Sequence, residues 1–386
     1  MLSIVRGGMD VHEADAKIAL ITSKWNGQEK ARGDFTPGTI IHEERIVNRP
    51  DRIRKTFKCL MKKYGKLEMC YEASSCGYVL QRQLTEMGIE CRVVAPSKIP
   101  KKPGDRVKTD RRDARKLAKL FWADQLTYVR VPEKAEEAVR DLVRCRDAFR
   151  KDVTRARHRV QKFLQRHGLN YEGKSNWTQR HWKWLKGLKF EGYEKWVYEK
   201  YLVDLEWKKS QLEEADGEIE KVASTEEYRE EVGRLRCLKG IDTLSAMTLI
   251  AETVDFKRFP SAAGLMDYFG LVPSEDSSGK RERRGSITKT GNGRVRRILV
   301  EAAWHYQHRP ALSKTLRKRQ EGQPEWVKSH SWKAQRRLCK KYRGVIEKGH
   351  VKQVATVAVA RELVGFIWAI MQPHEPGSEE FEFSEA

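Results

Sequence analysis

Four acidic residues in the first third of the chain stand where apolar segments end and where side chains from different segments can meet. Asp10 and Glu72 each close a short apolar run with strand character. Asp110 and Asp113 lie three residues apart at the start of an amphipathic segment, so both would lie on one face of a helix. Carboxylate oxygens are preferred ligands of Mg²⁺ and Mn²⁺. The pattern predicts a divalent-metal site suited to phosphoryl transfer.

The segments that must position these carboxylates alternate between strand and helix patterns. Strands are predicted at 3–11, 16–21, 39–47, 67–72 and 89–94, and helices at 51–64, 76–87 and 109–123. In an α/β domain of this order, the first and fourth strands become neighbours and the last helix packs beside them. We therefore expect one domain over residues 1–130 in which the four carboxylates converge. For any single one of them, a solvated surface acid or a helix cap is the alternative.

A second candidate site lies in a glycine-rich stretch of the C-terminal half. Ser277 and Ser278 precede Gly279, and a serine hydroxyl there could act as a nucleophile. Such a hydroxyl is a weak nucleophile that needs activation, and no histidine lies within the motif. From the residues alone, a serine in an ordinary flexible turn is the favoured interpretation.

Basic residues follow these serines closely. Glycines among them would let backbone amides approach phosphates. Residues 280–297 contain eight basic residues and one acidic residue, Glu282. The basic residues are Lys280, Arg281, Arg283, Arg284, Lys289, Arg294, Arg296 and Arg297. This density predicts contacts to the DNA backbone, which position the polymer without reading its bases.

Two long charged segments, 133–170 and 193–236, predict helices that pair as an antiparallel coiled-coil arm. The first carries nine basic residues against two acidic ones between 144 and 166, and Arg150, Arg155, Arg157 and Arg159 are its candidate nucleic-acid contacts. A tryptophan-rich stretch, 177–196, separates the two segments. Its aromatic rings could stack on RNA bases, or they could serve self-association of the arm.

Composition narrows the class of protein. The 386 residues include 77 Lys and Arg against 54 Asp and Glu, a net charge of +23 that favours a polyanionic partner. The two basic stretches carry seven net charges each, which predicts two surfaces. No run approaches the roughly 20 apolar residues of a membrane span. Seven cysteines without a CxxC pair fit a reducing cytosol.

We expect an arm at 131–236, a mostly helical domain at 237–373 and a disordered acidic tail at 374–386.

Several motifs together resemble one family, the DEDD transposases of bacterial insertion sequences, which includes Piv-type invertases and bridge-RNA-guided recombinases. The motifs are Met9-Asp10-Val11-His12, Tyr71-Glu72-Ala73-Ser74, Lys108-Thr109-Asp110-Arg111-Arg112-Asp113-Ala114, Leu238–Asp242, Tyr268-Phe269-Gly270-Leu271-Val272-Pro273, Ser277-Ser278-Gly279-Lys280, Ile287-Thr288-Lys289-Thr290-Gly291-Asn292 and Val357-Ala358-Val359-Ala360-Arg361. They extend from residue 8 to about residue 372. Each motif is weak alone, and the set is specific.

The resemblance implies a ribonuclease-H-like, RuvC-like domain with Asp10, Glu72, Asp110 and Asp113 as catalytic metal ligands. It implies that Ser278 attacks the DNA phosphodiester and forms a phosphoserine, with Ser277 as a competitor. It also implies donor and target DNA as partners, a structured bridge RNA as guide, and dimers that pair into a tetramer. In that assembly the carboxylates of one protomer would act with the serine of another. The setting would be the bacterial cytoplasm, at the nucleoid.

Two other classes of function are compatible with the sequence. A junction resolvase or nuclease of RuvC-like type would use the four carboxylates and a water nucleophile. A non-catalytic nucleic-acid-binding protein would use only the basic surfaces. The carboxylates distinguish the second from the enzymes, and Ser278 distinguishes the first from a recombinase.

Overall fold

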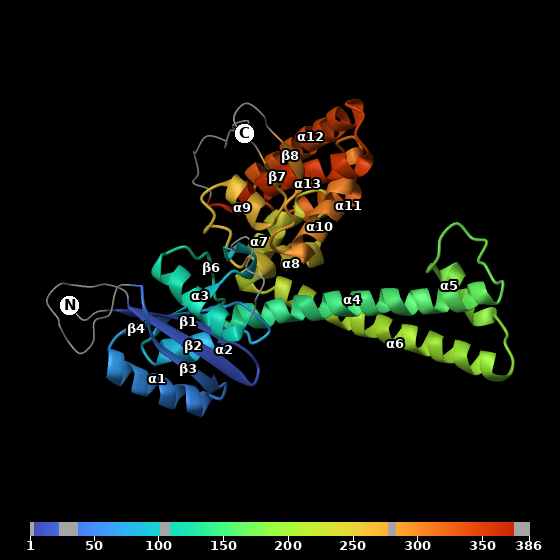
Figure 1. Ribbon diagram of the computed structural model, residues 1–386. Helices are drawn as coiled ribbons and strands as arrows, with labels where there is room; N and C mark the ends of the chain where they lie inside the picture. Colours follow the sequence, from blue (N-terminus) through green and yellow to red (C-terminus); the bar gives the residue numbers. More distant parts are fainter. Residues whose placement is uncertain (1–3, 23–37, 101–108, 277–282, 374–386) are drawn as a thin grey trace. The chain divides into compact units, whose positions relative to one another are not determined.

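The computed structural model describes residues 4–22, 38–100, 109–276 and 283–373. The chain divides into two compact units, Met1–Val131 and Pro132–Ala386, drawn in Figure 1. The first unit is built on a sheet, and the second is helical except for one short hairpin.

The sheet of the first unit has six strands in the order β3-β2-β1-β4-β5-β6. Their bounds are β1 Val5–Val11, β2 Asp15–Thr22, β3 Ile40–Val47, β4 Leu67–Glu72, β5 Glu90–Val94 and β6 Tyr128–Val129. β1 pairs antiparallel with β2 and parallel with β4, so the predicted adjacency of the first and fourth strands is confirmed. β6, which the sequence pattern did not predict, adds antiparallel to β5.

Helices cover both faces of this sheet. On one face, α1 (Pro50–Tyr64) and α2 (Val79–Glu86) enclose a core that includes Met9, Phe57 and Tyr71. On the other face, α3 (Asp110–Trp122) packs Ala114 and Ala118 against β2. A 3₁₀ turn, η1 (Pro96–Lys98), follows β5. A mixed sheet with helices on both faces is the arrangement of a RuvC-like fold, so the predicted fold class is confirmed.

Gly8 allows α3 to lie directly on β1. A Cβ atom at this position would come within 2.4 Å of the backbone nitrogen of Ala118 and 2.6 Å of the carbonyl oxygen of Ala114. Real Cβ atoms do not approach backbone this closely, so any side chain here would push the helix away. The missing side chain brings the start of α3, with its two aspartates, to the end of β1.

The second unit begins with the arm. α4 (Lys134–Arg166) and α6 (Gly192–Ala223) run side by side, with α5 (Gln179–Gly187) at their far end (Figure 1). Val160, Phe163, Tyr198 and Leu205 form the apolar seam between them.

The segment predicted as one helix over 193–236 is two helices. α6 ends at Ala223, and α7 (Glu226–Arg236) begins after Thr225, whose backbone is extended. Two glutamates in the first turn of α7 favour a new helix start, because they interact well with the positive end of the helix dipole.

The rest of the second unit packs around one apolar core. Its elements are α8 (Thr243–Thr253), α9 (Ala262–Tyr268), β7 (Pro273–Glu275), β8 (Arg284–Ile287), α10 (Gly293–Ala303), the 3₁₀ turn η2 (Trp304–Gln307), α11 (Lys314–Gln320), α12 (Glu325–Glu347) and α13 (Lys352–Met371). The apolar pattern of the sequence predicts helices at 244–253, 261–268, 294–306 and 351–372, and residues from all four contribute to this core. α12 was not predicted.

α13 is the most apolar helix of the core. Among the described residues it alone is long and apolar enough to cross a membrane, and 67% of its most apolar window is buried inside the unit. It packs against α9, α10 and α12. This burial is the pattern of a central core helix.

Candidate active site and nucleic-acid interface

The structure brings Asp10, His12 and Asp110 together at the end of β1. Nε2 of His12 lies 3.3 Å from Oδ2 of Asp10 and 3.9 Å from Oδ1 of Asp110. One ligand atom from each of the three residues lies within 4.8 Å of the others. β1 supplies Asp10, the turn after it supplies His12, and the first residue of α3 supplies Asp110.

Asp10 and Asp110 differ in what controls their charge state. Burial raises the pKa of Asp10, and the Asp110 and Asp113 carboxylates raise it further, while His12 acts in the opposite direction. Lys17, directly across the β1–β2 pair from Asp10, donates to Oδ2 of Asp110 at 2.5 Å. That hydrogen bond lowers the pKa of Asp110. The two aspartates therefore differ in environment, because Asp10 is partly buried beside His12 whereas Asp110 is held by the Lys17 ammonium.

Glu72 and Asp113 lie beside this group. β1 and β4 pair in parallel up to Met9 and Tyr71, so Glu72 follows on the strand next to Asp10. Side chains alternate between the faces of a strand, and the Arg6–Glu68 ion pair places the even-numbered residues of both strands on one face. Glu72 therefore lies on the same face as Asp10, although it is exposed and outside the three-residue group. Asp113 is near enough to affect the charge state of Asp10.

His12 and Lys17 are site residues that the sequence analysis did not single out. His12 is two residues after Asp10, the spacing that returns a side chain to the same face. Lys17 is the cross-strand partner of Asp10 in the β1–β2 hairpin. The spacing from Asp10 points to His12, and a predicted register for that hairpin would have identified Lys17.

The donor set fits a divalent cation. Two carboxylates and an imidazole stand close together, and burial, with a smaller contribution from the neighbouring aspartates, raises the pKa of Asp10. Carboxylate-rich sites of this kind suit hard cations such as Mg²⁺ or Mn²⁺. The Lys17 ammonium occupies one oxygen of Asp110 and would compete with such a cation for it.

In the second unit, β7 and β8 form a hairpin whose connection contains the candidate nucleophiles. Ser277, Ser278, Lys280 and Arg281 fall outside the described residues. On either side of that segment, the backbone nitrogen of Asp276 donates to the carbonyl oxygen of Arg283 at 2.9 Å. Asp276 and Arg283 therefore form the last described pair of the hairpin, and Ser277 and Ser278 follow Asp276 directly in the sequence.

The base of this hairpin is tightly packed. Gly270 and Gly291 both have positive φ, and a Cβ on either would come within 2.1 Å of a carbonyl oxygen of the facing segment. Nη1 of Arg296 donates to the carbonyl oxygens of Phe269 and Thr290, at 2.8 and 2.9 Å. Arg296, predicted as a DNA contact, thus fastens two segments of its own chain together.

The other predicted DNA contacts of this region differ in their surroundings. Arg294 and Arg297 both contact the carboxylate of Asp147 on α4. Arg283, Arg284 and Lys289 belong to the hairpin and the turn after it. Lys289 has a positive φ of 55°, an uncommon conformation for a residue with a side chain.

The predicted contacts on the arm also have partners within the chain. Arg150 pairs with Asp147, Arg155 with Asp152 and Arg159 with Asp204. The guanidinium of Arg157 lies 5.2 Å from the ring centre of Trp177, so it stacks on an aromatic face. Arg155 is the most exposed of the three ion-paired side chains, at 71%.

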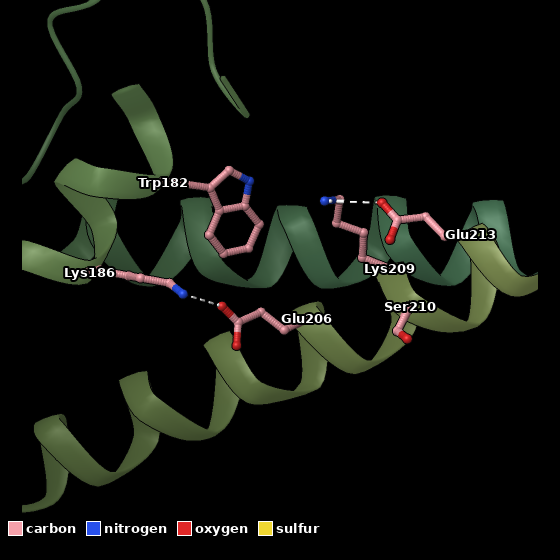
Figure 2. Close-up of a pocket in the computed structure, with 6 residues that line it drawn as sticks. All are labelled: Trp182, Lys186, Glu206, Lys209, Ser210 and Glu213. Atoms are coloured by element: carbon pink, nitrogen blue, oxygen red, sulfur yellow. Dashed lines mark ion pairs between the residues drawn. The ribbon is translucent and has the colours of Figure 1, made fainter. Parts of the chain in front are cut away.

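The tryptophan-rich end of the arm contains both packed and open surfaces. Trp177 and Trp184 contact His181, which is buried. Trp182 borders an open cavity of about 320 Å³ between α5 and α6 (Figure 2). Two ion pairs, Lys186–Glu206 and Lys209–Glu213, lie along its edge at 2.8 and 3.1 Å. The cavity therefore combines one aromatic wall with balanced charge.

Known families match both halves of the chain. A family model for DEDD transposases matches residues 34–168, and one described as the transposase IS116/IS110/IS902 family matches residues 232–317. The transposase of insertion sequence element IS1533 from Leptospira borgpetersenii is 36% identical and covers 88% of this chain and 95% of its own length. The protein y4qE of Sinorhizobium fredii, which is also named as a transposase, is 39% identical over 94% of this chain and 87% of its own length. A more distant relative, the transposase of IS1111A from Coxiella burnetii, is 23% identical over 79% of this chain.

A DEDD transposase family is consistent with the acidic residues found on the RuvC-like sheet. The second family match, over residues 232–317, includes the segments that form the base of the β7–β8 hairpin. The chain belongs to the IS110/IS116/IS902 family of insertion-sequence transposases, which are enzymes that cleave and rejoin DNA.

Proposed function

We propose that this transposase cuts DNA at the carboxylate site of its first unit, with Asp10, Glu72, Asp110 and Asp113 as the catalytic acids. The observation that carries the proposal is the convergence of Asp10 and Asp110 from two distant segments. Asp10 and Asp110 would hold a divalent cation, Mg²⁺ or Mn²⁺, with Glu72 and Asp113 beside them. A cation bound there would neutralise charge that develops on the scissile phosphate.

The nucleophile we propose is the hydroxyl of Ser278, with Ser277 as the alternative. Its oxygen forms a bond to phosphorus while the bond from phosphorus to a deoxyribose oxygen breaks, and the hydroxyl proton passes to solvent or to the leaving oxygen. The phosphoserine keeps the phosphodiester bond energy for rejoining. Support comes from the family motifs at residues 268–273 and 287–292, which form the packed base of the hairpin that contains these serines.

We also propose that donor and target DNA are selected by a bridge RNA, and that the protein acts as dimers paired into a tetramer at the nucleoid. In this assembly the basic stretch of the arm, 131–236, would bind RNA, and the basic stretch of the C-terminal domain, 237–373, would bind the DNA that is cut. The carboxylates of one protomer would act with the serine of another.

An exposed apolar face on α6 supports self-association. Tyr193, Trp196, Val203 and Trp207 follow heptad-like spacing and are at least 60% exposed. Lys200 lies on this face with its ammonium 5.6 Å from the ring centre of Trp196, and Glu199 and Glu206 follow the repeat along one side, so the face carries both signs of charge, as a self-associating coiled-coil surface does.

Strand cleavage of insertion-sequence ends tests the carboxylates. We expect Asp10→Asn to reduce cleavage by roughly a thousandfold or more. The matched control, Asp124→Asn, changes an exposed aspartate that pairs with Arg6 outside the site, and it should cleave like wild type. Recombination that survives Asp10→Asn would refute the proposed role of these carboxylates in cleavage.

Ser278→Ala and Ser277→Ala test the nucleophile. Mass spectrometry of a trapped protein–DNA adduct would identify the serine that is modified. Continued cutting by Ser278→Ala and by Ser277→Ala would favour a RuvC-like resolvase that uses water. Recombination by purified protein in the absence of any RNA would refute the guide.

A further inference from the structure

Five cationic side chains gather where α4 and the start of α10 meet. Three come from the arm and two from the C-terminal part, and we call them the basic cluster: Arg144, Arg150, Lys151, Arg294 and Arg297. The sequence analysis placed these residues on two separate surfaces. The structure joins members of both basic stretches at one location.

One buried carboxylate, Asp147, connects four of the five cations. Its oxygens lie 2.9 Å from Nζ of Lys151 and 3.1 Å from Nη2 of Arg150. The guanidinium nitrogens of Arg294 and Arg297 lie 3.4 and 3.3 Å away. Burial opposes ionisation of Asp147, yet hydrogen bonds from Lys151 and Arg150 lower its pKa, so it remains charged.

A second buried carboxylate, Glu252 on α8, holds the fifth cation. Arg144 donates to both of its oxygens at 2.8 Å, in a two-pronged arrangement that fixes the guanidinium plane. The side-chain amide of Asn292 also donates to Glu252, at 2.7 Å. Asn292 caps the N-terminus of α10, so Glu252 joins the arm to the helix that carries Arg294 and Arg297.

The exposures show which charges solvent can reach. The side chains of Asp147 and Glu252 are 8% and 1% exposed, whereas the five cations are 30–48% exposed. Including Glu301, which contacts Arg297, three carboxylates face five cations. The accessible surface is therefore positive, and its charged groups are already held in position by the buried acids.

The basic cluster also lies close to the hairpin of the candidate nucleophiles. Gly291, immediately before Asn292, packs against Tyr268 at the hairpin base, and Arg294 follows two residues after Asn292. An anion bound at the cluster would therefore lie near this base.

We propose that the basic cluster is a prearranged binding site for the phosphodiester backbone of a nucleic acid, formed jointly by the arm and the C-terminal part. This proposal rests on the proposed function, because the bound backbone would be that of a transposition substrate or its guide. Fixed guanidinium groups bind phosphate oxygens well, and holding them in place before binding lowers the entropic cost of the contact. DNA and RNA present the same chemistry here, so the test uses both.

The test is the salt dependence of binding by the full chain, measured in EDTA so that cleavage does not contribute. The probes are a random-sequence DNA duplex and an RNA hairpin with the same number of phosphates. The double variant Arg294→Ala, Arg297→Ala should make the plot of log binding constant against log salt concentration less steep. We expect the magnitude of its negative slope to fall by about 1 to 2 on at least one probe, because each lost duplex contact contributes about 0.9. Asp147 keeps Arg150 and Lys151 in this variant, and circular dichroism checks the fold.

Arg150→Ala is the second variant of the test, because a site shared by both helices predicts that removing a cation from α4 also makes the salt dependence less steep. The control is Arg337→Ala on α12, a guanidinium that is 44% exposed and paired with Glu362, which should keep the wild-type slope. Unchanged slopes on both probes, or a change from only one of the two helices, would overturn the joint site. Because cleavage is measured separately, a failed Asp10→Asn test would leave this result standing, and the reverse also holds.

Discussion

The acidic site of the first unit and the basic cluster of the second are assembled by opposite means. In the first unit, Gly8 lets α3 approach β1 closely, and this packing brings the carboxylates of Asp10 and Asp110 together beside His12 and Lys17. In the second unit, Asp147 and Glu252 are buried and draw cations from two helices around them. Close backbone packing is the main device at the first site, and buried carboxylates are the main device at the second.

This difference explains what each site can bind. Carboxylates brought together at the end of β1 offer oxygen ligands to a divalent cation, whose charge would favour their ionised forms. Cations that outnumber their buried acids keep positive charge that a phosphate can neutralise. A transposase needs both properties, since it must hold a polyanion and also stabilise charge that develops on it. The comparison predicts that packing changes should harm the first site most and charge changes the second.

The largest effect should come from Gly8→Ala. The added Cβ would collide with the backbone of α3, so we expect the first unit to lose about 3 kcal/mol of stability and cleavage to fall to background. Hydrogen exchange of the β1 amides and a strand-cleavage assay measure the two effects. The same substitution at Gly217 on α6, where a Cβ meets no atom within 4 Å, should be neutral or slightly stabilising. Equal behaviour of the two variants would refute the packing argument.

A charge change in the second unit should have the next largest effect. Glu252→Gln keeps the shape of the side chain but leaves Arg144 without its buried anion, so we expect a loss of about 2 kcal/mol. Urea unfolding of the second unit, followed by tryptophan fluorescence, checks this. Glu301→Gln, which alters an exposed partner of Arg297, should change stability little. A neutral Glu252→Gln would show that charge does not hold this cluster.

Lys17→Met sharpens the account of the acidic site. Removing the ammonium frees an oxygen of Asp110 and raises the local negative charge, so affinity for Mn²⁺ should rise by about 1 kcal/mol, roughly fivefold. Electron paramagnetic resonance of Mn²⁺ titrations measures this affinity. Lys58→Met, on the exposed side of α1, is the control and should have no effect. A weaker affinity in Lys17→Met would mean that Lys17 supports the bound cation rather than competing with it.

The smallest predicted effect concerns Glu43 on β3. Hydrogen bonds from Arg115, at 2.5 Å, and from Arg111 lower its pKa to about 2. A lowered pKa in the folded state adds stability above the ordinary value of 4.5, and that stability is lost as pH falls toward 2. Glu43→Gln should therefore cost up to about 1 kcal/mol at pH 7 and nothing near pH 2. Parallel acid-unfolding curves for wild type and Glu43→Gln would contradict the prediction.

Much of the first unit could be predicted because its signals are local. Each strand and helix has its own apolar period, and the order of elements places β4 beside β1. The placement of Asp10 beside Asp110 followed from that order. Lys17 escaped notice because its role depends on the register of a hairpin, which apolar periodicity alone does not determine. His12 lies in the motif around Asp10, but that motif alone assigns it no separate role.

The second unit was harder to predict for two physical reasons. α12 buries Val327, Ser331, Ala334 and Leu338 at helical spacing, but the serine and alanine conceal this face from an apolar pattern. The basic cluster depends on a contact between Asp147 and residues nearly 150 positions later in the chain. A count of charges identifies the two basic stretches, but only tertiary structure shows that a buried acid joins them.

α13 has a consequence for how the protein is made. A helix apolar enough for a bilayer is a hazard while it lacks partners, because targeting machinery or other unfolded chains can bind it. Its partners α9, α10 and α12 all precede it in the chain, so the ribosome releases them first. When α13 emerges, the helices that it packs against have already been synthesised. This apolar helix can therefore be buried soon after it leaves the ribosome.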